Sequence, residues 1–124
     1  MPAVLIIDDD ELMLNITREI LEDEGYTVYA TADGPRGIEL YKEFRPHLVL
    51  LDLGLPTMGG LEVLASIRTI DSGATVVIVS GYVSPEARER AAHLGVSTFI
   101  EKGIHIEELV GRIRGVLKSL GKEH

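Results

Sequence analysis

Two hydrophobic patterns alternate along the chain. Short apolar or alternating runs are typical of strands, and segments in which apolar residues recur every three or four positions are typical of amphipathic helices. The two patterns follow each other five times, which indicates five strand-helix units. The predicted strands are Ala3–Ile7, Tyr26–Thr31, Leu48–Leu51, Thr75–Val79 and Ser97–Glu101.

Turn and cap residues mark the ends of the predicted helices. Gly25 ends the first helix, Pro35 opens the second, and the pair Ser84-Pro85 is typical of a cap followed by the first helical position. The predicted helices are Glu11–Glu24, Pro35–Phe44, a third carrying Leu61, Leu64 and Ile67, a fourth from Ser84-Pro85 to Gly95, and a fifth over about Ile104–Leu120. The first should have Leu12, Ile16, Ile20 and Leu21 on one side, and the last should bury Ile106, Leu109, Val110, Ile113, Leu117 and Leu120.

The short strand-helix repeats favour one architecture. Connections of this length join parallel strands by right-handed crossovers, so we expect an α/β fold with a doubly wound parallel sheet. The 124 residues, 45% of them hydrophobic, suit a single domain over residues 1–124 with its own core. Ligands of such sheets bind beyond the carboxyl ends of the strands.

Charge and composition exclude several function classes. The net charge of −8 disfavours direct contact with nucleic acid or an anionic membrane. No apolar run exceeds five residues, and the N-terminus lacks the basic and apolar regions of a secretory signal. The absence of cysteine excludes thiolate sites and is compatible with a reducing compartment. We therefore expect a cytoplasmic protein.

Polar residues of complementary chemistry follow four of the predicted strands. Asp8 and Asp9 follow the first, Asp52 the third, Ser80 the fourth and Lys102 the fifth. In a parallel sheet these positions share one edge, where carboxylates, a hydroxyl and an ammonium group would meet. Such a set could hold a divalent cation and a phosphoryl group.

Each of these residues also has a purely structural interpretation. One aspartate after a strand commonly caps the next helix, a Ser-Gly pair commonly makes a turn, and most lysines are solvated. Three adjacent aspartates, Asp8 to Asp10, are different, because only one can cap and a hard cation would offset the repulsion of the others. Asp52 precedes a glycine-rich loop, and a carboxylate is a competent nucleophile toward phosphorus.

Four segments in order, LIIDDD, LLDLGLPTMGGLEVL, VVIVSGY and FIEKG, resemble the receiver domain of bacterial two-component response regulators. The resemblance spans the chain and implies a flavodoxin-like fold of five helices around five strands in the order 2-1-3-4-5. It also implies a phosphorylation-dependent switch. Asp52 would accept a phosphoryl group from a histidine kinase or phosphotransfer protein, and an unidentified downstream protein would read the result.

The resemblance assigns further roles by position. A Mg²⁺ cofactor would be held by Asp8, Asp9, Asp52 and the backbone carbonyl of Gly54. Ser80 would be the switch hydroxyl and Lys102 the partner of the phosphoryl group. Phe99 would be the aromatic rotamer switch, acting on the face formed by the fourth helix, fifth strand and fifth helix. No enzymatic activity is expected beyond self-phosphorylation and autodephosphorylation.

The chain departs from the family pattern at several positions. Gly103 follows Lys102 where proline is usual, and Gly59 replaces a frequent aspartate. Gly54 and Tyr82 occupy positions that modulate loss of the phosphoryl group in the family.

Two alternatives share parts of this pattern. One is a receiver-like interaction module that is no longer phosphorylated, which is supported only by Gly103 in place of the usual proline. The other is a phosphatase with an aspartate nucleophile, which needs a second acid two residues further on, where this chain has Gly54.

Overall fold

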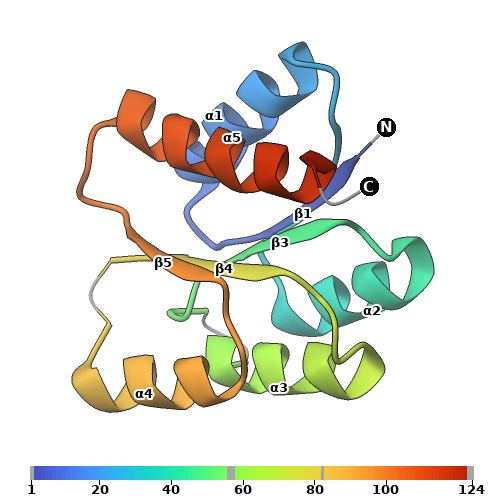
Figure 1. Cartoon of the computed structure of the whole chain (residues 1–124). Coiled ribbons are helices and arrows are strands. Elements are labelled where there is room, and N and C mark those ends of the chain that lie inside the picture. Colours follow the sequence, from blue (N-terminus) through green and yellow to red (C-terminus); the bar gives the residue numbers. More distant parts are fainter. Residues whose placement is uncertain (1, 56–57, 82, 123–124) are drawn as a thin grey trace.

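Five parallel strands form one sheet in the order β2-β1-β3-β4-β5, as expected for the predicted fold (Figure 1). The computed structural model describes residues 2–55, 58–81 and 83–122. Each predicted strand is present, and the observed ends lie within one residue of the predicted ones. The strands are β1 (Ala3–Ile7), β2 (Thr27–Thr31), β3 (Leu48–Leu51), β4 (Val76–Ser80) and β5 (Thr98–Glu101).

A helix follows each strand, and the five helices cover both faces of the sheet. Figure 1 shows α1 and α5 on one face and α2, α3 and α4 on the other. Side chains of β1 alternate between the two cores: Leu5 and Ile7 pack on the side of α2 and α3, while Val4 and Ile6 pack on the side of α1 and α5. The helices are α1 (Glu11–Asp23), α2 (Gly34–Phe44), α3 (Gly60–Ile70), α4 (Pro85–His93) and α5 (Ile106–Lys122).

Capping residues lie at helix boundaries that the sequence indicated. The Ser84 hydroxyl accepts a hydrogen bond from the Ala87 N–H at 3.1 Å and caps α4. Gly25 and Gly95, which follow α1 and α4, have φ angles of 95° and 76° that favour glycine. Within the described ranges, no helix combines the length and apolar composition needed to cross a membrane.

The buried side of α1 differs from the predicted one. Leu12 is 72% exposed, whereas Leu14, Thr17 and Leu21 are buried. Positions two apart on a helix point about 200° away from each other, so burying Leu14 turns Leu12 outward. The prediction is confirmed for Leu21 and wrong for Leu12, because Thr17, which completes the buried row, is polar and was not counted with it.

Candidate functional site

The sheet register brings the predicted site residues to one edge. Asp52 donates its backbone N–H to the Ile7 carbonyl at 2.9 Å, and Lys102 donates its own to the Ser80 carbonyl at 2.9 Å. Asp8 likewise donates to the Thr31 carbonyl at 3.1 Å. The ladder hydrogen bonds thus continue into the site, so the rigid sheet fixes the backbone of the residues that carry the chemistry.

Lys102 joins two buried carboxylates. Its Nζ lies 2.8 Å from Asp8 Oδ1 and 2.9 Å from Asp52 Oδ2. Asp8 is 3% exposed and Asp52 is 5% exposed. Burial disfavours the ammonium form, but the hydrogen bonds to both carboxylates outweigh it and raise the pKa of Lys102. One permanent positive charge therefore faces two acids at the edge of the core.

Asp52 is held by three donors. Oδ1 accepts hydrogen bonds from the Ser80 hydroxyl at 2.8 Å and from the Gly54 N–H at 3.0 Å, and Oδ2 accepts from Lys102. Burial alone would raise the pKa of Asp52, but these donors reverse the effect and lower it below its usual value. Asp52 is therefore an ionised carboxylate near neutral pH, the form in which a carboxylate acts as a nucleophile.

Asp8 responds in the opposite direction to similar burial. Desolvation raises the pKa of Asp8 to about 6, even though Lys102 and the Asp10 N–H both donate to Oδ1 and favour the ionised form. Asp10 itself caps α1 by accepting from the Met13 N–H at 3.2 Å. Of the three adjacent aspartates, Asp10 is therefore the one that caps α1.

A metal ion fits the acidic cluster. Carboxylate oxygens of Asp8, Asp9 and Asp52 all lie within 4.8 Å of one another, and Asp9 is exposed while the other two are buried. Hard oxygen donors of this kind suit a cation such as Mg²⁺. Burial is the main cause of the raised pKa of Asp8, and the neighbouring negative charge of Asp52 adds to it. A divalent cation would offset that charge.

Comparison with known families agrees with this geometry. The sequence profile of the response regulator receiver domain matches residues 4–114. The chain belongs to this family.

Individual relatives are similar over nearly the whole receiver domain. The chain is 32% identical over 116 residues to the chemotaxis protein CheY of Halobacterium salinarum, and the alignment covers 94% of this chain and 97% of that protein. It is 34% identical over 115 residues to the cell cycle response regulator CtrA of Brucella ovis, covering 93% of this chain but only 50% of CtrA. A CheY-like receiver domain from Methanospirillum hungatei JF-1 superposes with a TM-score of 0.91 at 31% identity, covering 100% of this chain and 99% of that one.

Phe99 lies apart from the carboxylates of the receiver domain. It pairs with Ile78 in the register of β5 and β4, and its half-buried ring packs against the core on the side of α3 and α4. The guanidinium of Arg88 lies over this ring, 4.4 Å from its centroid. The sequence singled out Phe99 but not Arg88, because no periodic pattern connects residues on two different elements.

The departures from the family pattern leave the observed site intact. Lys102 reaches both carboxylates although Gly103 follows it, and the described residues contain no cis peptide bond. Gly54 is exposed, and its N–H donates to Asp52. Tyr82 lies outside the described residues.

Proposed function

We propose that this receiver domain is a phosphorylation-dependent signalling switch that accepts a phosphoryl group on Asp52 from a histidine kinase or phosphotransfer protein in the cytoplasm. The geometry around Asp52 supports this best. A buried, ionised carboxylate is paired with one ammonium group and one hydroxyl, the two kinds of side-chain donor that phosphoryl oxygens require.

In the transfer step, an Asp52 oxygen bonds to phosphorus while the phosphorus–nitrogen bond of the donor phosphohistidine breaks and its imidazole leaves. Lys102 and Ser80, which now contact Asp52, are placed to donate to the transferred oxygens. Mg²⁺ held by Asp8, Asp9, Asp52 and the Gly54 carbonyl would neutralise the charge gathered on the phosphoryl group. In this proposal the domain catalyses only the phosphorylation and dephosphorylation of its own Asp52.

Phosphorylation changes both charge and hydrogen bonding at Asp52. The acceptor goes from one negative charge to roughly two and gains three acceptor oxygens. The Ser80 hydroxyl, which donates to Asp52 in this structure, is drawn to the phosphoryl group, and Phe99 turns into the vacated space. The active shape is a minor state beforehand, and phosphorylation raises its population.

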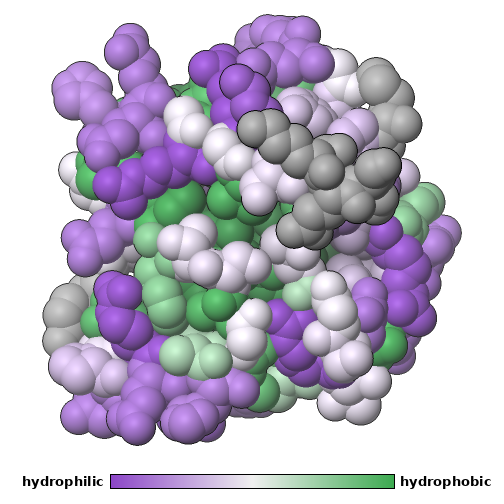
Figure 2. All heavy atoms as spheres, in the orientation of Figure 1, coloured by the Kyte–Doolittle hydropathy of each residue, from purple (hydrophilic) through white to green (hydrophobic). Residues whose placement is uncertain are grey.

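The face that changes is one that a partner protein could read. Figure 2 shows a band of more hydrophobic and intermediate residues between the hydrophilic surfaces of α5 and α4, where β5 runs and where Phe99 is half-buried. Moving Phe99 inward alters the middle of this face. A downstream protein would therefore distinguish the two states by the surface of α4, β5 and α5.

The acceptor assignment is tested by chemical phosphorylation. With acetyl phosphate and Mg²⁺, the wild-type domain should gain one phosphoryl group that hydroxylamine removes, as acyl phosphates require. Asp52→Asn should gain none, because it lacks the nucleophile, while the surface variant Asp23→Asn should label like wild type. Intact-protein mass spectrometry gives the readout. Labelling of Asp52→Asn would refute the assignment, and no labelling of any variant would favour the unphosphorylated interaction module.

The switch itself is tested by NMR with beryllofluoride, which stands in for the phosphoryl group. Amide shifts should be larger around residues 80–84 and 99–103 than in α1 and α2, because the former join Asp52 to the face that changes. Changes confined to Asp8, Asp9 and Asp52 would show a domain that binds the anion without switching.

A further inference from the structure

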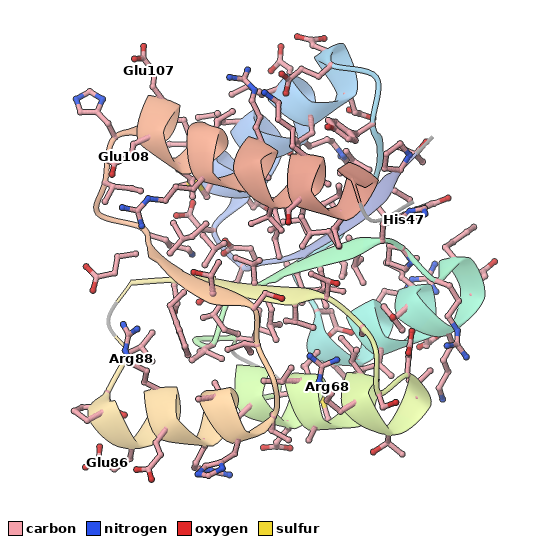
Figure 3. The ribbon with its side chains drawn as sticks, viewed as in Figure 1. His47, Arg68, Glu86, Arg88, Glu107 and Glu108 are labelled. Atoms are coloured by element: carbon pink, nitrogen blue, oxygen red, sulfur yellow. The ribbon has the colours of Figure 1, made fainter. Side chains whose placement is uncertain are left out.

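A cation–π contact connects the first half of α4 with the sheet. The Arg88 side chain rises from α4 toward β5, and its guanidinium carbon lies 4.4 Å from the centroid of the Phe99 ring (Figure 3). A cation over the face of an aromatic ring is attracted by the ring's negative quadrupole. The partner of Arg88 is thus the residue expected to rotate when the domain switches.

Among the residues that the structure describes, Arg88 has no ion-pair partner that would compete with the ring. Arg36, Arg45, Arg112 and Arg114 each pair with a carboxylate, whereas among the described residues no carboxylate lies within 4.0 Å of the Arg88 guanidinium. The side chain is exposed, so neither burial nor an ion pair fixes its position. The Phe99 ring is the contact that orients it.

The other end of α4 is anchored more firmly. The Arg68 guanidinium, on α3, donates to the carbonyls of Leu94 at 2.5 Å, Gly95 at 2.7 Å and Ala74 at 2.5 Å (Figure 3). Within α4 the buried side chain is Ala91. The C-terminal end of α4 is therefore clamped, whereas the stack of Arg88 on Phe99, in the N-terminal half nearest the phosphoryl site, is exposed and reversible.

We propose that Arg88 is a latch that holds Phe99 in its resting orientation and so sets the resting balance of the switch. This rests on the proposed function, because Phe99 must leave the guanidinium when it turns inward. At an exposed site, losing such a stack should change the equilibrium between the resting and active shapes about two- to fivefold. Since the active shape is the minor state, its population and the affinity of any ligand that prefers it rise by the same factor.

The sign of the effect separates the latch from simple electrostatics. Removing a positive charge should weaken binding of an anion at Asp52, whereas opening a latch should strengthen it. Beryllofluoride with saturating Mg²⁺ is the probe, titrated by NMR. Arg88→Ala should bind it about two- to fivefold more tightly than wild type, and Arg88→Lys, which keeps a cation, should lie between them.

Two further variants make the result specific. Arg90→Ala, on the same helix and also exposed, removes the same charge without touching a described ring and should not strengthen binding. In a Phe99→Leu background, Arg88→Ala should have no effect, because the stacking partner is gone. A gain that persists without Phe99, an equal gain in Arg90→Ala, or no gain in Arg88→Ala would each overturn the latch.

A second readout does not depend on phosphoryl chemistry. Three-bond couplings report the χ1 rotamers of Phe99 in the unmodified domain, and Arg88→Ala should raise the inward population by the same factor. Should no variant bind beryllofluoride, the proposed function fails while this measurement still decides on the latch. Unchanged rotamer populations would refute it, and chemical denaturation would verify that each variant is folded.

Discussion

Asp8→Asn should raise the melting temperature of the metal-free domain by roughly 10 °C near neutral pH. Burial raises the pKa of Asp8 from 3.8 to about 6, which means that folding disfavours its charge. A shift of this size corresponds to about 3 kcal/mol of folding free energy. Asparagine removes the charge but keeps an oxygen that can accept from Lys102 and from the Asp10 N–H.

The effect has a defined pH window. Because the folded pKa of Asp8 lies above the unfolded one, the native state keeps its proton to higher pH, and stability falls as pH rises from about 4 through about 6. Wild type and Asp8→Asn should therefore be about equally stable below that window and differ fully above it. Thermal unfolding in EDTA at several pH values measures the difference.

Asp52→Asn is the matched control at the same edge. The fold lowers the pKa of Asp52, so its ionised form contributes stability above the unfolded pKa, and this variant should melt below wild type. Mg²⁺ at ten times its dissociation constant should stabilise wild type by about 1.4 kcal/mol and Asp8→Asn by less. If Asp8→Asn melts no higher than wild type in EDTA, burial of the Asp8 charge does not cost folding free energy.

The clustering of the site was predictable because the hydrophobic pattern fixes the sheet. Continuous apolar runs at β1, β3 and β4 define where each strand ends, and parallel strands end at one edge. Asp8, Asp52 and Lys102 were therefore placed together before any contact was known. Residue order along the chain is sufficient for that inference.

The opposite pKa shifts of Asp8 and Asp52 were not predictable from the sequence. Asp8 and Asp52 have the same side chain at equivalent strand ends, yet their pKa values shift in opposite directions. The cause is the number of donors, since Asp52 accepts from Ser80, Gly54 and Lys102, whereas Asp8 accepts only from Lys102 and the Asp10 N–H among the described residues. Donor sets arise from three-dimensional packing of separate loops, which no pattern in the sequence encodes.

Gly60 is a structural requirement that the sequence indicated only as part of a loop. It is the first residue of α3 and its N–H donates to the Leu53 carbonyl at 3.2 Å. A β-carbon at Gly60 would overlap the Leu53 Cα and would lie 2.5 Å from the Asp52 carbonyl oxygen. The start of α3 can pack this closely against the end of β3 only because residue 60 has no side chain.

Gly60→Ala should therefore destabilise the domain by about 3 kcal/mol, because the clash is with backbone atoms that cannot rotate away. The corresponding fall in melting temperature is roughly 10 °C. Beryllofluoride binding should weaken as well, since relieving the overlap moves the backbone of Asp52. Thermal unfolding and the beryllofluoride titration measure the two effects.

Gly115→Ala makes the same chemical change where nothing lies within 4 Å of the added carbon. This position is exposed in the middle of α5, so alanine should stabilise the helix by up to about 1 kcal/mol. The two variants should thus shift the melting temperature in opposite directions. If Gly60→Ala is as stable as wild type and binds beryllofluoride normally, α3 can move away from Asp52 and Leu53 without cost, and the close packing at Gly60 does not position Asp52.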